Sequence, residues 1–153
     1  MLKEYEKRIK AACETVYDVA NRTPLDAAPR LSERLNNEVL LKREDLQPVF
    51  SFKLRGAYNR IAQLTEQEQA CGVIAASAGN HAQGVALAAK RKGITATIVM
   101  PKTTPRIKVE AVRKLGAEVV LHGNAYDDAS QHAYKLIEQS GAVYIPPYDD
   151  PAI

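Results

Sequence analysis

Short apolar runs alternate with longer helical patterns through the second half of the chain. The apolar runs predict strands at four places, residues 72–76, 94–100, 117–121 and 142–145. Each helical pattern between them stops at a glycine, a residue that often ends a helix: Gly93, Gly116 and Gly141. Short apolar strands joined by helices predict a parallel sheet with helices on both faces. We therefore expect an α/β fold, a three-layer αβα arrangement around a four-stranded parallel sheet.

The first third of the chain is less regular. Apolar residues at helical spacing predict an amphipathic helix over residues 1–20, and Leu31 and Leu35 indicate a short second helix. A strand is expected at residues 39–42. These pieces are too short to form a fold of their own, so we place a domain boundary near residue 50, with residues 51–153 as a small α/β domain.

Two helix starts have recognisable capping signals. Thr65 and Glu68 have the spacing of a capping box, in which each side chain bonds the backbone N–H of the other residue. Thr104 followed by Pro105 predicts an N-cap and a first helical residue. A further helix is expected over residues 52–64.

The composition indicates a globular protein. The 153 residues are 46% hydrophobic and 25% charged, and the net charge of +3 gives no reason to expect nucleic acid or a membrane as a partner. Cys13 and Cys71 lie outside any C-x-x-C pair, so we expect no metal site and interpret both as reduced packing residues. The charged first turns do not have the apolar core of a signal peptide, which predicts a cytoplasmic location.

The octet Ser-Ala-Gly-Asn-His-Ala-Gln-Gly at residues 77–84 joins a predicted strand to a predicted helix. Gly79 is free to take a positive φ in this turn. Unpaired N–H groups and the helix dipole make the turn a candidate anion site. It matches neither the P-loop nor the G-x-G-x-x-G pattern. The simpler alternative is a glycine-bearing turn whose polar side chains are satisfied locally.

Lys53 lies between Phe52 and Leu54, in the segment Ser-Phe-Lys-Leu-Arg-Gly-Ala at residues 51–57. A lysine in apolar surroundings can be partly desolvated, which lowers its pKa and makes the free amine available as a nucleophile or base. The alternative is a solvated lysine whose aliphatic stem covers an apolar patch. The residues of this segment alone favour the solvated lysine.

The two segments together, 26 residues apart, resemble the threonine dehydratase family of pyridoxal-phosphate (PLP) enzymes, which have the tryptophan-synthase-β-like fold. The resemblance runs through nearly the whole chain. Further matching pieces are residues 22–25, 42–48, 98–101, 119–123 and 146–151. It implies that residues 51–153 are the smaller domain of that fold. Residues 1–50 would be an N-terminal segment of a larger, incomplete domain.

The resemblance also implies roles for particular residues. Lys53 looks like the Schiff-base lysine and the base that removes the substrate's α-proton. Phe52 and Asn80 are expected to contact the cofactor, Asn80 through the oxygen on its ring. The residues expected to hold the substrate carboxylate are Ser77, Ala78, Gly79, Asn80 and His81.

The implied reaction is the conversion of L-threonine to 2-oxobutanoate and ammonia, the first step of isoleucine biosynthesis, by an enzyme that is a homo-oligomer at full length. Related racemases carry a serine where this chain has Ala78, which favours a dehydratase. The run Gln47-Pro48-Val49 favours the biosynthetic type. The alternatives are a serine dehydratase or racemase of the same fold, and a free-standing α/β binding or assembly module without catalysis.

In the family, the glycine-rich loop that binds the PLP phosphate lies further along the chain. The eight glycines of this sequence are all isolated. Oriented donors to a charged group contribute about 1.5–3 kcal/mol each. We therefore expect the chain to be an N-terminal portion of the enzyme with little or no turnover alone.

Overall fold

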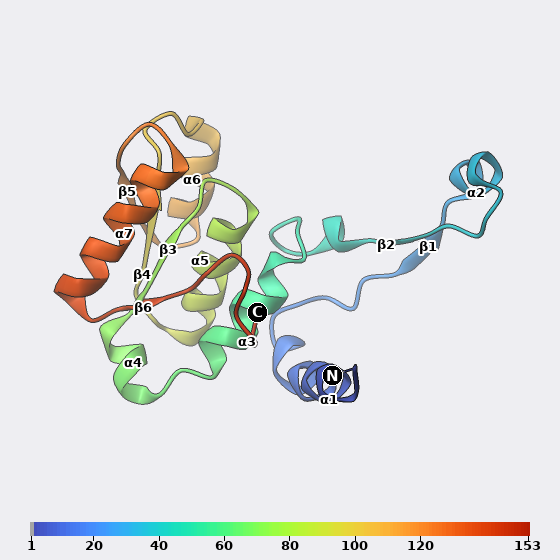
Figure 1. Ribbon diagram of the computed structural model, residues 1–153, viewed down its shortest axis with the longest axis horizontal. Coiled ribbons are helices and arrows are strands. Elements are labelled where there is room, and N and C mark those ends of the chain that lie inside the picture. The colour runs from blue at the N-terminus through green and yellow to red at the C-terminus, as the bar shows by residue number, and fades with distance from the viewer. Residues whose placement is uncertain (1) are drawn as a thin grey trace.

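Four parallel strands form the central sheet, in the order β5-β4-β3-β6. The strands are β3 (Val73–Ala76), β4 (Ala96–Met100), β5 (Glu118–Leu121) and β6 (Val143–Tyr144). The structure is a computed structural model that describes residues 2–153 (Figure 1). The predicted α/β class and the four-stranded parallel sheet are confirmed, and each strand is shorter than expected by one or two residues.

Helices cover both faces of this sheet. The helices of this part of the chain are α3 (Lys53–Ala62), α4 (Glu66–Cys71), α5 (Asn80–Lys92), α6 (Arg106–Lys114) and α7 (Tyr126–Ser140). Helix α7 packs on one face, α5 and α6 pack on the other, and α3 lies against α5 (Figure 1). Gly93 and Gly141 end α5 and α7 in the left-handed region, with φ of 69° and 71°, as their positions predicted.

The core is divided by the sheet because successive strand residues point to opposite faces. Ile74 and Val99 pack with α7, in a cluster that includes Ala129 of that helix. Val73 and Ile98 pack on the other face, in a larger cluster that includes residues of α3, α5 and α6. The strands are therefore buried on both sides, which is why they read as continuous apolar runs.

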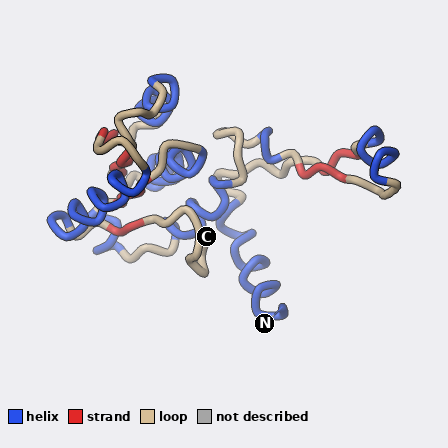
Figure 2. Tube along the Cα trace, turned by 45° about the horizontal axis from the view of Figure 1, so that its top comes forward, coloured by secondary structure: helices blue, strands red, loops and turns tan. Residues whose placement is uncertain are grey.

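The first 50 residues extend away from this sheet. Helix α1 (Leu2–Val16) packs on α3, and the chain then forms an arm that projects outward (Figures 1 and 2). The arm contains β1 (Leu25–Ala27), α2 (Pro29–Leu35), β2 (Leu40–Lys42) and the 3₁₀ turn η1 (Glu44–Leu46). Strands β1 and β2 pair antiparallel, and β1 was not predicted. The large apolar residues of the arm are exposed: Leu25, Leu31, Leu35, Leu40, Leu41 and Leu46.

The structure tests the predictions made for two helix starts and for the two cysteines. The capping box of Thr65 and Glu68 is present. Helix α6 instead begins at Arg106 with Pro105 as its N-cap, so the Thr104 hydroxyl does not cap it. Proline ring geometry at the N-cap supplies the extended entry without a side-chain bond. Cys13 and Cys71 are free thiols as expected, but both are exposed rather than packed in the core.

Within residues 2–153, no helix is long and apolar enough to cross a membrane. Over the same residues, no group of three or more His, Cys, Asp or Glu side chains is placed to hold a metal ion.

Candidate active site around Lys53

The turn at residues 77–81 connects β3 to α5. The backbone N–H of Ser77 continues the sheet by donating to Val99, and the Ser77 hydroxyl accepts a hydrogen bond from the Gly79 N–H at 3.3 Å. Gly79 is the N-cap of α5 with φ of −134°, so the turn does not use the positive φ that glycine allows. A methyl group placed on Gly79 would meet nothing within 4 Å. The start of α5 is therefore open for a ligand.

Lys53 is the first residue of α3, and α3 touches α5 at Gly84. The Lys53 N–H donates to the Ser51 hydroxyl at 3.2 Å. A methyl group on Gly84 would lie 3.1 Å from the carbonyl carbon and oxygen of Lys53. Asn80 is four residues before Gly84 and shares its helix face. The absence of a side chain at Gly84 therefore brings the first turn of α5 beside the lysine.

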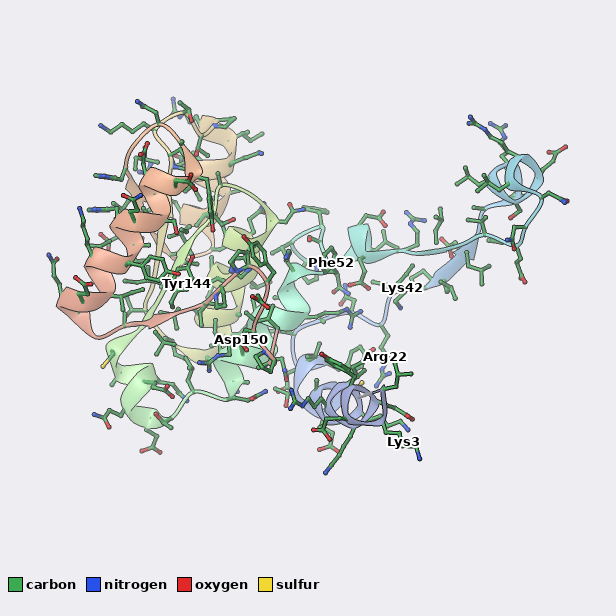
Figure 3. The ribbon with its side chains drawn as sticks, in the orientation of Figure 1. Lys3, Arg22, Lys42, Phe52, Tyr144 and Asp150 are labelled. Carbon is green, nitrogen blue, oxygen red and sulfur yellow. The ribbon has the colours of Figure 1, made fainter. Side chains whose placement is uncertain are left out.

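The Lys53 amine is half-buried and points toward the segment that follows β6. Its Nζ donates to the carbonyl oxygen of Pro147 at 2.5 Å. The same nitrogen lies 5.5 Å from the centroid of the Phe52 ring. Phe52 is 59% exposed and lies at the N-terminal end of α3 (Figure 3). An amine held between a carbonyl and an aromatic ring, at the edge of solvent, is positioned to meet a small ligand.

His81, in the first turn of α5, is only 3% exposed. Its Nε2 donates to the carbonyl oxygen of Ile145 at 2.9 Å, because a carbonyl can only accept. Burial lowers the pKa of His81, and the charge of Lys53 lowers it further against the opposing effect of the Ile145 carbonyl. The ring is therefore neutral, and Nδ1 carries a lone pair. Within residues 2–153 this buried Nδ1 has no hydrogen-bond partner.

A polar cluster holds the base of the arm against α3. Arg55 donates to both carboxylate oxygens of Glu44, at 2.7 and 2.8 Å. The Thr23 hydroxyl bonds the same carboxylate at 2.5 Å, and the Gln47 side chain exchanges two hydrogen bonds with the backbone of Asn21. The Arg55 pair lowers the pKa of Glu44 to about 2. These bonds hold the first turn of α3, where Lys53 lies.

The expected site residues converge only in part. Lys53 and the turn of residues 77–81 come together, and His81 is buried between α5 and the end of β6. Asn80 and Phe52 are exposed, at the open side. Sequence reasoning missed the two carbonyls that hold Lys53 and His81. A signal did exist for Gly84, because an isolated glycine inside a helical pattern indicates a close approach of backbone.

The sequence places the chain in a known protein family. A sequence profile described as pyridoxal-phosphate dependent enzyme matches residues 16–153. The chain therefore belongs to the family of pyridoxal-phosphate dependent enzymes.

Particular relatives narrow the comparison. The biosynthetic L-threonine dehydratase of Pasteurella multocida is 57% identical over 150 residues, which are 98% of this chain and 29% of that protein. The structure of the processed form of threonine deaminase isoform 2 from Solanum lycopersicum matches 98% of this chain and 42% of that chain, with a TM-score of 0.90 and 54% identity. Maize serine racemase matches 95% of this chain and 44% of that chain, with a TM-score of 0.90 and 32% identity. The chain spans about a quarter of the length of the curated relatives it matches.

The described residues fit the reactive side of the family's cofactor. The aldehyde needs an amine, and Lys53 supplies one that is half-buried beside an aromatic ring. The open space at Gly79 and the unpartnered Nδ1 of buried His81 leave room and hydrogen-bonding capacity next to it. The residues needed on this side of the cofactor are therefore present.

Proposed function

We propose that this chain is the N-terminal portion of a biosynthetic threonine dehydratase, which uses PLP to convert L-threonine to 2-oxobutanoate and ammonia. The observation that carries the proposal is that Lys53 at the start of α3 and His81 in the first turn of α5 donate to carbonyls only two residues apart in the chain. The level of identity to a protein named threonine dehydratase supports the same substrate. The product places the reaction at the start of isoleucine biosynthesis.

Each site residue has a physical task in this proposal. When bound, the cofactor would withdraw electrons from the substrate's α-carbon. Lys53 would supply the amine for the cofactor aldehyde, and its Nζ would also be the base that takes the α-proton. The loop from Ser77 to His81 would hold the substrate carboxylate. The N–H groups of Asn80 and His81 suit this task because they are unpaired within the helix and lie at the positive end of its dipole.

The two exposed residues would contact the cofactor itself. Phe52 presents a ring to solvent next to the lysine amine, which suits stacking on a planar aromatic group. Asn80 is exposed at the first residue of α5, where its amide can donate to the oxygen on the cofactor ring. Neither task needs the side chain to move out of a packed core.

The arm supports the assignment of residues 1–50 to a second, larger domain. Its exposed leucines lie on short strands and a short helix with little of their own core to cover. The rest of a longer protein would bury them. Assembly of that protein into a homo-oligomer and a cytoplasmic location remain predictions.

Two other functions compete with this one. A serine dehydratase or racemase would use the same lysine, and the racemase alternative is weakened by Ala78, which has no hydroxyl to act as a second base. The identity of 54% to the tomato threonine deaminase against 32% to the maize racemase favours the same choice. A non-catalytic binding or assembly module would not need a lysine amine half-buried at the start of a helix.

Borohydride trapping tests the proposal. The full-length enzyme is incubated with PLP, reduced and digested, and the labelled peptide is identified by mass spectrometry. We expect label on Lys53, loss of label and of 2-oxobutanoate formation in Lys53→Ala, and no effect of Lys10→Ala on α1. Label spread over surface lysines would refute the catalytic role of Lys53. The 153-residue chain assayed alone is expected to show little or no turnover, and robust turnover would contradict that expectation.

A further inference from the structure

Two side chains from different helices bind the same short backbone segment. Segment 145–147 follows β6 and consists of Ile145, Pro146 and Pro147. His81 from α5 donates to the carbonyl of Ile145, and Lys53 from α3 donates to the carbonyl of Pro147. The catalytic candidate and the buried histidine are therefore linked through three residues of backbone.

Few hydrogen bonds hold segment 145–147, and its packing anchor is the buried Ile145 side chain. Pro146 and Pro147 have no N–H, so neither can anchor the segment by donating a hydrogen bond. The Ile145 N–H donates to Ile74 of β3 at 2.9 Å, which fixes the beginning of the segment. Beyond that point, the bond from His81 to the Ile145 carbonyl sets the plane of the peptide that leads into Pro146. The restricted φ of the two prolines then carries that direction to the Pro147 carbonyl.

We propose that His81 is a positioning residue for Lys53: its bond to the Ile145 carbonyl orients segment 145–147, so that the Pro147 carbonyl holds the lysine amine beside the start of α5. This inference rests on the proposed function, because it gives the lysine of that function its location. His81 takes no part in proton transfer in this scheme.

The surroundings of His81 fit a neutral donor. The ring is buried and lies close enough to Lys53 for the lysine charge to disfavour an imidazolium, so the lowered pKa of His81 keeps it uncharged. A neutral ring can donate from Nε2 without repelling the ammonium group that the Pro147 carbonyl holds. A positively charged residue in the same place would repel that ammonium group.

Chemical labelling of the lysine measures this position without relying on activity. The full-length enzyme, stripped of its cofactor, is treated with trace acetic anhydride, and acetylation at Lys53 is measured relative to exposed Lys102 by peptide mass spectrometry. In His81→Leu the donor is lost, and we expect Lys53 to react roughly 5-fold faster, the effect of about one hydrogen bond on the fraction of time that the amine is held. The variant His81→Gln keeps a donor near the Nε2 position, and we expect it to react like the wild type.

Two further variants make the result decisive. His81→Asn keeps a polar side chain but places its amide short of Ile145, so it should behave like His81→Leu even if the leucine variant fails to fold. His122→Leu removes an exposed histidine at the end of β5 and should leave Lys53 labelling unchanged. The inference is overturned if folded His81→Leu or His81→Asn keeps the wild-type labelling ratio within 2-fold, or if His81→Gln reacts as fast as they do.

The test separates the inference from the proposed function. If borohydride trapping places no label on Lys53, the catalytic role of Lys53 fails. The acetylation ratios would still report whether His81 positions the amine. If trapping succeeds and the acetylation ratios do not change among the His81 variants, the catalytic role stands and the positioning role is wrong.

Discussion

Adding one methyl group at Gly84 should separate α5 from α3 at the point where they hold the site together. The methyl carbon of Gly84→Ala would lie 3.1 Å from the carbonyl carbon and oxygen of Lys53 and 3.2 Å from the Leu54 nitrogen. All three neighbours are backbone atoms, so no side chain can rotate away. Overpacking of this kind costs about 1–3 kcal/mol. Replacing glycine by alanine inside a helix contributes about 1 kcal/mol in the opposite direction, so the net loss of stability should be about 0–2 kcal/mol.

Urea denaturation followed by circular dichroism measures the net effect, and Gly84→Val provides the graded control. If backbone contact dominates, the valine variant should be less stable than the alanine variant by more than the difference in helix propensity, which is at most ~0.7 kcal/mol. The yield of borohydride-trapped label on Lys53 should fall in the same order. A gain of about 1 kcal/mol in Gly84→Ala, with trapping unchanged, would show that the two helices separate freely and would refute the reasoning.

Three further substitutions or titrations test other parts of the structure. Glu44→Gln removes the carboxylate paired with Arg55. The lowered pKa of Glu44, from 4.5 to about 2, corresponds to at most ~3.4 kcal/mol, which solvent at the carboxylate reduces to ~1–2. This stabilisation is fully present above pH 4.5 and is lost as the pH falls toward 2, so denaturation curves of wild type and variant should differ at pH 7 and converge near pH 2. Burial raises the pKa of Tyr144 above its usual value of 10, so absorbance titration should include a tyrosine that ionises later than a free phenol, and the free energy of unfolding should decrease as the pH rises above 10. Phe50→Gly should raise the melting temperature slightly, because φ at Phe50 is 56° and the ring is 77% exposed; a clear drop would contradict this.

The sheet could be predicted from the sequence because each strand is a short apolar run that ends at a glycine or proline or continues into a polar turn. Val73 and its neighbour Ile74 are buried on opposite faces of the sheet, so the apolar signal along the strand is continuous. Strand β1 could not be predicted in the same way. It has three residues, two of them exposed, and it exists because it pairs with β2 about 15 residues later. Pairing between distant segments leaves little local pattern.

For the candidate site, the sequence predicts side chains but not backbone contacts. The roles proposed for Lys53 and Asn80 depend on residue type, so a resemblance to known motifs can predict them. The carbonyls of Ile145 and Pro147 belong to the backbone, which every residue has, and residue type therefore does not mark them. Only the fold shows that β6 ends where His81 and Lys53 can both reach it.

Exposed aromatic residues lie close to the lysine or to its Pro147 partner in the sequence. Phe50 and Phe52 precede it in the chain, and Tyr148 follows the proline whose carbonyl holds its amine. The next residue of α3, Leu54, is completely buried, so the lysine lies at the boundary between a packed core and an aromatic surface. Fully burying such a ring stabilises a protein or complex by roughly 1.5–3 kcal/mol, a gain that these rings do not make within residues 2–153. The rings therefore contribute little to the stability of residues 2–153. A ligand or domain that buried them would gain that free energy. Substitutions there should weaken ligand or domain contacts and leave the fold intact, the opposite of a substitution in the core at Leu54.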